Sequence, residues 1–330
     1  MEKTQKKLTL FALTWPIFIE ILLHMLMGNA DTLMLSQYSD NSVAAVGVSN
    51  QILSVVIVMF GFIAGGAAIL VAQNLGADKP LAAGKVAMTS ISLNLLISLS
   101  LSLVLVIFSK QALLLMDIPS ELMDEASSYM KIVGGFMFVQ ALIMTVAAVL
   151  RSYGFTKDTM YVTIGMNLIN VIGNYFVIFG PFGFPVLGVV GVAYSTAISR
   201  LLGFIALIII LFVRSKRQLP IQSIFKYRKD DVLGLLRIGV PAGGEQLSYN
   251  LSQMVITYFI AQMGTLAITT KVYVQNIGMF IMLFTVAISQ GSQILIGHYI
   301  GAGQTDKAFE RGIKSLKISI LISTFADPSI

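Results

Sequence analysis

The amino-acid sequence predicts an all-α integral membrane protein built from two related helical bundles. Three observations support this class: an apolar composition, long apolar runs along the whole chain, and an internal repeat. Of the 330 residues, 56% are hydrophobic and only 12% are charged, and the mean hydropathy is +0.84. In soluble domains about a quarter of the residues are charged. We therefore expect most of the chain to be surrounded by lipid.

The apolar runs predict membrane-spanning helices. A helix rises about 1.5 Å per residue, so about 20 apolar residues cross a hydrocarbon core of ~30 Å. The runs do not alternate in hydrophobicity as the strands of a membrane barrel do, which excludes that fold. We predict nine helices, at residues 8–35, 43–72, 86–108, 127–150, 159–179, 187–213, 232–260, 267–296 and 313–324. The chain has no cysteine and hence no disulfide.

Basic residues predict the orientation of the chain. Five stretches on one side of the predicted topology hold 18 of the 22 Lys and Arg residues, namely 1–7, 78–85, 151–157, 214–237 and 304–317. Cytoplasmic loops carry such an excess, so we expect a cytoplasmic N-terminus in a multi-pass protein of the cell membrane. The same loops explain the net charge of +6, and we predict no nucleic-acid partner.

One constant offset aligns two parts of the chain. Adding 225 relates Pro16 to Pro241, Glu20 to Glu245, Gln37 to Gln262, Leu70 to Leu295 and Gly76 to Gly301. Six predicted helices separate the copies, so both enter the membrane in the same direction, and a binding site is expected between them. We predict an N-lobe of six helices at 1–213, a basic cytoplasmic linker at 214–231 and a partial C-lobe of three helices at 232–330.

The second copy is shorter than the first. It holds three of the predicted helices, whereas the first copy holds six. We expect a C-terminally truncated form, or a chain that a partner completes. Three helices do not enclose what six enclose, so an inactive fragment is one interpretation that the sequence leaves open.

Several segments carry a family resemblance. They are residues 29–34 (NADTLM), 43–47 (VAAVG), 150–154 (LRSYG), 188–193 (GVVGVA) and the loop at 296–304. In this order they resemble the multidrug and toxic compound extrusion (MATE) family over essentially the whole chain. The resemblance implies two six-helix bundles that form a V. It also implies export of amphipathic, often cationic compounds in exchange for H⁺ or Na⁺.

Acidic residues within the first predicted helix are candidates for cation coupling. Glu20, His24 and Asp31 lie on one stripe of a helix that turns about 100° per residue. A charge at the bilayer centre costs at least ~2.5 kcal/mol, so an acid there is a functional hypothesis. The resemblance implies that Asp31 is a cation or proton site. The alternative is an aspartate near the membrane surface that reaches water.

Amides on the fifth predicted helix complement these acids. Asn167, Asn170 and Asn174 share one face. The resemblance implies that Asn170 and Thr196 line the same lobe as Asp31, and that the position of Asn174 is an aspartate in proton-coupled members. The amide here puts a proton site of two carboxylates in doubt. Polar contacts that only hold helices together are the alternative.

Further polar residues point to substrate binding and gating. Arg200 lies near the middle of a 27-residue run, so we expect it to pair with Asp31 or Glu20. On the seventh predicted helix, Glu245, Tyr249, Ser252 and the flanking Gln253 form a polar face that we expect to bind substrate in a central cavity. Many family members carry the glutamate of this helix about two turns deeper. The assignment of Glu245 therefore depends on its acidic side chain and on the internal repeat, not on its position in the family. Pro16 and Pro241 occupy equivalent positions and can bend their helices as gates, or serve packing alone.

Taken together with these residues, the family resemblance implies a cation-coupled antiporter. It exports small amphipathic, cationic drugs or metabolites by alternating access, uses Na⁺ or H⁺ as coupling ion, and needs no cofactor. Neither a nucleotide-binding nor a zinc-protease motif occurs, and no nucleophile–base pair indicates an enzyme. A flippase for lipid-linked precursors is the alternative, but it would need a basic cavity, whereas the predicted mid-membrane charges are mainly acidic. Membrane lipid surrounds the protein, and we favour a monomer.

Overall fold

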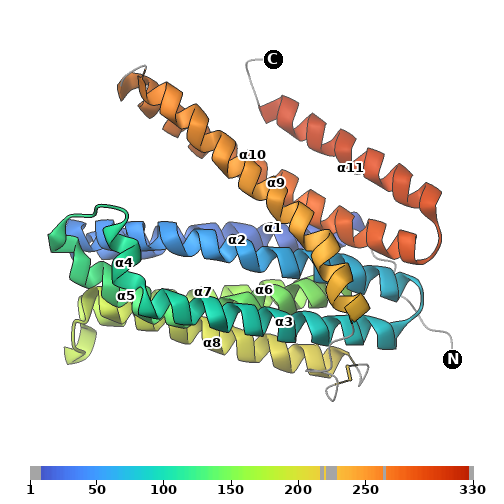
Figure 1. Cartoon of the computed structure of the whole chain (residues 1–330), viewed down its shortest axis with the longest axis horizontal. Coiled ribbons are helices and arrows are strands. Elements are labelled where there is room, and N and C mark those ends of the chain that lie inside the picture. The colour runs from blue at the N-terminus through green and yellow to red at the C-terminus, as the bar shows by residue number, and fades with distance from the viewer. Residues whose placement is uncertain (1–8, 216–218, 221–228, 263–264, 327–330) are drawn as a thin grey trace.

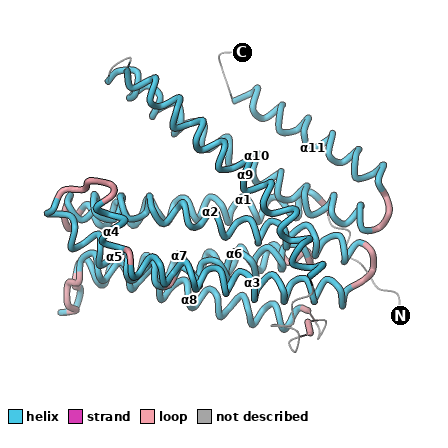
Figure 2. Tube along the Cα trace, viewed as in Figure 1, coloured by secondary structure: helices cyan, strands magenta, loops and turns pink. Residues whose placement is uncertain are grey.

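The protein is described by a computed structural model that covers residues 9–215, 219–220, 229–262 and 265–326. Almost all of these residues are helical, and no strand occurs among them (Figure 2). The helices are α1 (Leu10–Ser36), α2 (Asp40–Gly76), α3 (Pro80–Ile107), α4 (Ser109–Leu114), α5 (Met123–Gly135), α6 (Met137–Ser152), α7 (Thr156–Phe179), α8 (Gly188–Arg214), α9 (Lys229–Gln262), α10 (Thr265–Gly301) and α11 (Thr305–Ala326). The predicted all-α class is confirmed.

Membrane spans are clearest in the first two thirds of the chain. Within the described residues, α1, α2, α3, α7 and α8 are each long and apolar enough to cross a membrane. The helix predicted at 127–150 is instead divided into two helices, α5 and α6, which are bent by 42° at Phe136. The spans predicted in the last third form helices α9, α10 and α11, but none of these meets the same criteria within the described residues.

Local sequence signals set where several helices begin and end. Thr9 caps α1, because its hydroxyl accepts a 3.3 Å hydrogen bond from an N–H of the first turn. Pro80 begins α3, at a position where a missing N–H costs no helical bond. Gly180 ends α7 with a φ of +59°, which glycine adopts without a Cβ clash. Pro16 and Pro241 both lie inside continuous helices, and their role in gating stays a prediction.

Two bundles form a V (Figure 1). Helices α1–α8 are the first bundle and helices α9–α11 the second. They meet at the end of the molecule that holds the turns at 77–79, 153–155 and 302–304, which we call the basic end, and they diverge toward the opposite end (Figure 1). At the contact, α2 packs against α9 and α10, and α1 packs against α10.

Glycines let the backbones of α2 and α10 touch at the basic end. A Cβ atom on Gly76 would lie 2.1 Å from the carbonyl oxygen of His298, and one on Gly301 would lie 1.9 Å from that of Gln73. The offset of 225 relates Gly76 to Gly301 and Gln73 to His298. Each contact is therefore the counterpart of the other. His298 Nε2 also lies 2.9 Å from the carbonyl oxygen of Ser152, which ties α10 to the end of α6.

A second pair of glycines, Gly66 and Gly291, also contacts the opposite bundle at positions related by this offset. A Cβ atom on Gly66 would lie 2.8 Å from the carbonyl oxygen of Leu235. One on Gly291 would lie 2.6 Å from Thr14 Oγ1 and, at an ordinary contact distance, 3.5 Å from Leu10 Cδ1. The same offset relates the contacts with Leu235 and with Leu10. The repeat seen in the sequence is thus a repeat of tertiary contacts. The apolar cluster between α1 and α10 consists of Leu13, Ile17, Ala287, Ile294 and Leu295.

Candidate functional site

A cavity of about 640 Å³ lies where the first bundle faces α10 of the second bundle, and most of the residues that line it belong to the first bundle. Helices α1, α2, α5, α6 and α8 of the first bundle and α10 of the second form its walls. Sites for small molecules commonly measure ~300–1,000 Å³. The main polar residues in the wall are Glu20, His24, Asp31, Asn50, Tyr129, Gln140, Arg151, Thr196, Arg200, Gln290 and Gln293.

Asp31 of α1 is held in the cavity wall by an amide of α7. Asn174 Nδ2 donates to Asp31 Oδ1 at 2.5 Å and to Asn170 Oδ1 at 3.4 Å. Asn170 Nδ2 in turn donates to Thr196 Oγ1 at 3.3 Å. The two asparagines are fully buried behind the wall, whereas Asp31 and Thr196 line the cavity. The structure thus joins four of the residues predicted for cation coupling in one hydrogen-bonded chain.

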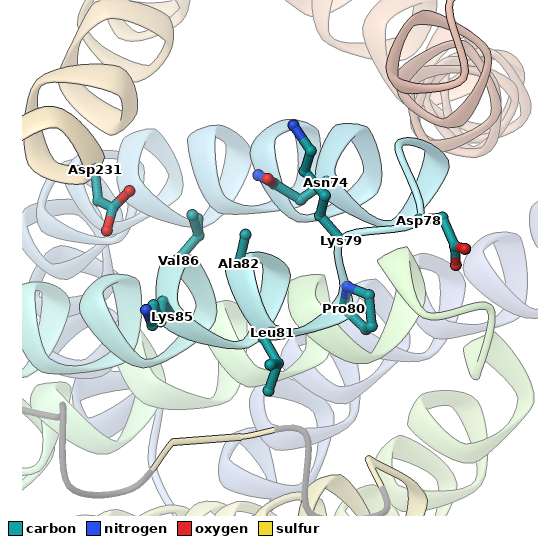
Figure 3. Close-up of a pocket in the computed structure, with 9 residues that line it drawn as sticks. All are labelled: Asn74, Asp78, Lys79, Pro80, Leu81, Ala82, Lys85, Val86 and Asp231. Carbon is teal, nitrogen blue, oxygen red and sulfur yellow. The ribbon is translucent and has the colours of Figure 1, made fainter.

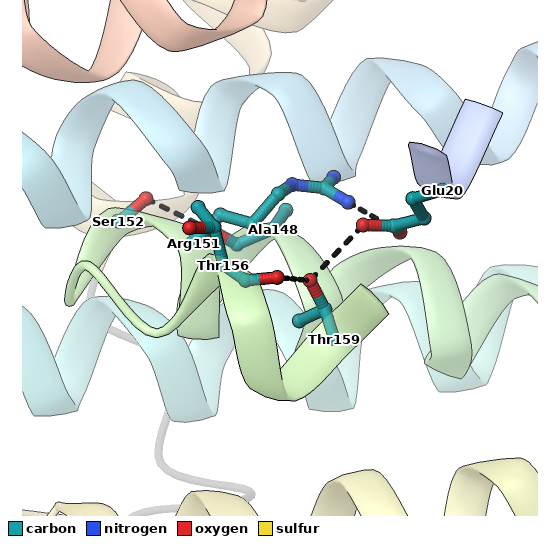
Figure 4. A network of polar contacts seen from close by, with 6 residues as sticks. All are labelled: Glu20, Ala148, Arg151, Ser152, Thr156 and Thr159. Atoms are coloured by element: carbon teal, nitrogen blue, oxygen red, sulfur yellow. Dashed lines mark hydrogen bonds and ion pairs between the residues drawn. The ribbon is translucent and has the colours of Figure 1, made fainter. Parts of the chain in front are cut away.

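Glu20 belongs to a separate network near the basic end (Figure 4). Arg151 Nη1 donates to Glu20 Oε1 at 2.7 Å, and Thr159 Oγ1 donates to Glu20 Oε2 at 3.0 Å. A buried carboxylate needs such partners. We expected Arg151 to lie in a basic loop and Arg200 to pair with Glu20 or Asp31. The structure differs because the last turn of α6 carries Arg151 into the cavity wall beside α1.

Arg200 of α8 lines the cavity near mid-helix. It lies within electrostatic range of Asp31 and Tyr129. Its Nε is buried without a hydrogen-bond partner, and the described part of the chain gives its other nitrogens no hydrogen bond or ion pair. Arg200 therefore differs from Arg151, whose charge is matched directly by a carboxylate.

The polar face predicted on α9 lies away from this cavity. Glu245, Tyr249 and Ser252 are exposed and Gln253 is half-buried. None of these residues lines the cavity between the bundles. The structure therefore does not bring them together with Asp31 and Glu20, and their role in substrate binding stays a prediction.

Several cavity residues had not been singled out from the sequence. Tyr129 of α5 donates from its hydroxyl to Asn50 Oδ1 of α2 at 3.3 Å. Gln290 and Gln293 come from α10, so the second bundle contributes amides to the wall. Two glutamines three residues apart in an apolar run were a usable signal, because they share one helix face. Tyr129 gave no such signal, since an isolated tyrosine in an apolar run is usually core.

A second pocket, of about 450 Å³, lies at the basic end (Figure 3). Asp78, Lys79 and Lys85 come from the α2–α3 turn and the start of α3, and Asp231 comes from α9. Two lysines and two aspartates balance in charge, and this pocket lies at helix ends. In the part of the chain that the structure describes, no group of three His, Asp or Glu side chains is arranged to hold a metal. We therefore assign the candidate transport site to the cavity between the bundles.

Comparison with known proteins identifies the family. The MatE family model matches residues 16–176 and 241–326. The Uncharacterized transporter YisQ of Bacillus subtilis is 58% identical over 311 residues, which cover 94% of this chain and 68% of that protein. The Probable multidrug resistance protein NorM of Thermotoga maritima is 27% identical over 329 residues, covering 97% of this chain and 71% of that protein.

Solved structures share the fold. A MATE transporter of the MOP superfamily in an outward-facing conformation matches with a TM-score of 0.86 at 20% identity, over 97% of this chain and 73% of that one. A MOP superfamily transporter from Pyrococcus furiosus matches with the same TM-score at 21% identity and the same coverage. The family model covers most of the chain, so the chain belongs to the MATE family of multi-pass membrane transporters, which are not enzymes.

Proposed function

We propose that this chain exports small amphipathic molecules from the cell in exchange for Na⁺ or H⁺, by alternating access of the cavity between the bundles. The observation that carries the proposal is Asp31, a carboxylate in the wall of a 640 Å³ cavity, held by the amide of Asn174. An acid placed there costs stability, and a coupling role accounts for its presence.

The site offers oxygen atoms as well as a titratable group. Asn174 Oδ1 is buried without a hydrogen-bond partner and lies on the side chain that holds Asp31. Hard cations take carboxylate and amide oxygens as ligands. The carboxylate also takes up a proton in the proton-coupled case. A cation and a substrate that compete for Asp31 are exchanged if the cation has the higher affinity for one arrangement of the two bundles and the substrate for the other.

The closed contact at the basic end supports alternating access. With α2 and α10 touching there, the bundles diverge toward the opposite end (Figure 1). If the basic end is cytoplasmic, as the distribution of Lys and Arg predicts, this arrangement faces outward. Opening to the cytoplasm then requires the glycine contacts to separate. We propose that Pro16 and Pro241 are bending points in this change.

The charge of the cavity bears on the choice of cargo. The sequence predicted mainly acidic mid-membrane charges, but the wall holds Arg151 and Arg200 as well as Glu20 and Asp31. The cavity is therefore balanced in charge. It is not the basic cavity that a flippase for pyrophosphate-linked lipids needs, and we favour export of small molecules. The lobe boundaries at residues 213 and 232, the cytoplasmic N-terminus and a monomeric state are part of this proposal.

Proteoliposomes test the proposal directly. Ethidium export is measured under an imposed Na⁺ gradient, a pH gradient or neither, with wild-type protein and with Asp31→Asn. We expect one gradient to drive export in the wild type and neither to do so in Asp31→Asn, at equal reconstitution. Export by Asp31→Asn at the wild-type rate would contradict the role of Asp31. Export that ignores both gradients would contradict ion coupling.

A further inference from the structure

Arg200 is a cation that the first bundle leaves without a bonded partner. It lines the cavity from α8, and its Nε is buried with no hydrogen bond. No hydrogen bond or ion pair of its terminal nitrogens occurs within residues 9–215, 219–220, 229–262 and 265–326. The other arginine of the cavity, Arg151, bonds to Glu20 at 2.7 Å. The two arginines therefore serve different purposes.

Neither Asp31 nor Tyr129, both polar neighbours of Arg200, forms a hydrogen bond with it in the described part of the chain. Asp31 attracts Arg200 electrostatically, but its carboxylate is held from α7 by Asn174 at 2.5 Å. Tyr129 also lies near Arg200, and its hydroxyl donates to Asn50. A guanidinium has five N–H donors in a flat fork and no acceptor. A buried charge without acceptors is costly, so a ligand that supplies them is favoured at this point of the wall.

We infer that Arg200 binds an anionic group, a carboxylate or a phosphate, on the transported molecule. The guanidinium fork matches two oxygens of such a group, and it is less strongly hydrated than an ammonium. Gln290 and Gln293 bring amides to the same cavity from α10, and methionines of α1 and α6 supply an adaptable apolar surface. The cargo is thus an amphipathic molecule with an acidic group at Arg200; a zwitterion also places its amine at Asp31. This inference shares one assumption with the proposed function, namely that this cavity is the transport site.

Two matched fluorescent probes test the inference. Dansylglycine carries a carboxylate and dansylcadaverine carries an amine on the same fluorophore. Their affinities are measured by anisotropy in phosphatidylcholine nanodiscs, with no ion gradient, for the wild type and for Arg200→Gln. Arg214→Gln is the control, because Arg214 lies on the same helix, is 51% exposed and pairs with Asp158 outside the cavity.

We expect Arg200→Gln to weaken dansylglycine binding at least about tenfold, since a charge-assisted hydrogen bond is lost. Dansylcadaverine should bind Arg200→Gln no more weakly than the wild type, and Arg214→Gln should bind both probes as the wild type does. Nanodiscs with added phosphatidylglycerol separate two sources of the anion. A loss of dansylglycine affinity there that is larger in the wild type than in Arg200→Gln identifies a lipid headgroup phosphate as a ligand of Arg200. An equal change in both proteins reflects the surface charge of the membrane alone and identifies a small-molecule carboxylate.

Equal dansylglycine affinity in the wild type and in Arg200→Gln would overturn the inference. An equal loss for both probes would also overturn it, because that result shows a structural role. If Arg200→Gln does not fold, Arg200→Lys is measured instead. A loss of affinity for dansylglycine alone supports binding of an anionic group by the guanidinium fork, and unchanged dansylglycine affinity rejects it. Binding is measured without a gradient, so a failure of coupled export would contradict the proposed function and leave this result intact.

Discussion

Replacing Gly301 by alanine should force the two bundles apart at the basic end. The added Cβ atom would lie 1.9 Å from the carbonyl oxygen of Gln73 and 3.0 Å from the backbone nitrogen of Ala77. Ordinary contacts of a Cβ atom begin at 3.4 Å. The helices must therefore separate locally by about 1.5 Å, because the opposing atoms belong to the backbone and cannot rotate away.

The cost is large enough to change the balance between two bundle arrangements. Overpacking of this kind costs about 1–3 kcal/mol. If the cost falls only on the closed arrangement, the separated one gains roughly 5–150-fold in relative population. Gly76→Ala should act in the same direction, since its Cβ atom would lie 2.1 Å from the carbonyl oxygen of His298. Gly47→Ala is the matched control in α2, because no atom lies within 4 Å of its added Cβ.

Spin labels measure the separation. The chain has no cysteine, so Leu81→Cys and Phe309→Cys can carry two labels without competing sites. Both positions are exposed, at the start of α3 and of α11, on either side of the closed contact. Pulsed electron–electron double resonance in nanodiscs measures the distance between the two labels. This distance should be short for the wild type and for Gly47→Ala, and its distribution should be longer and broader for Gly301→Ala. Identical distributions in Gly301→Ala and Gly47→Ala would refute the backbone contact.

Three further substitutions test the candidate site. Glu20→Gln leaves Arg151 without its carboxylate. Because 17% of the Arg151 side chain is exposed, the free energy of unfolding should fall by less than the about 3–5 kcal/mol of a fully buried pair. Thermal unfolding in detergent measures the loss, and Glu20→Gln with Arg151→Gln should recover part of it, whereas an unchanged midpoint argues against the pair. Asn174→Asp places a second carboxylate beside Asp31. Because two neighbouring carboxylates compete to ionise, dye export should depend more strongly on an imposed pH gradient than in the wild type. The same dependence on the pH gradient as in the wild type would count against this view of the site. Glu245→Cys should react with a membrane-impermeant thiol reagent, because we expect the polar face of α9 to meet water in a central cavity rather than lipid. Protection from both sides of the membrane would show that this face meets lipid or protein instead.

Much of the architecture could be predicted because it depends on local properties of the chain. Hydrophobic run length determines which segments become helices in lipid, and backbone hydrogen bonds within each helix do not depend on distant residues. The internal repeat was equally visible, because Pro16, Gly76 and their partners at 241 and 301 keep one constant spacing. The link between Asp31 and the amides of Asn170 and Asn174 was also within reach, since polar faces of apolar helices must meet protein or water.

Only the tertiary structure decided which charges meet. Glu20 and Arg151 are 131 positions apart in the chain, and no local pattern distinguishes this pair from the expected pairing with Arg200. No local pattern shows either that it is Asn174, 143 positions away on another helix, that bonds to Asp31. Sequence sets hydrophobicity and periodicity residue by residue, whereas the partner of a buried charge depends on the crossing geometry of several helices at once.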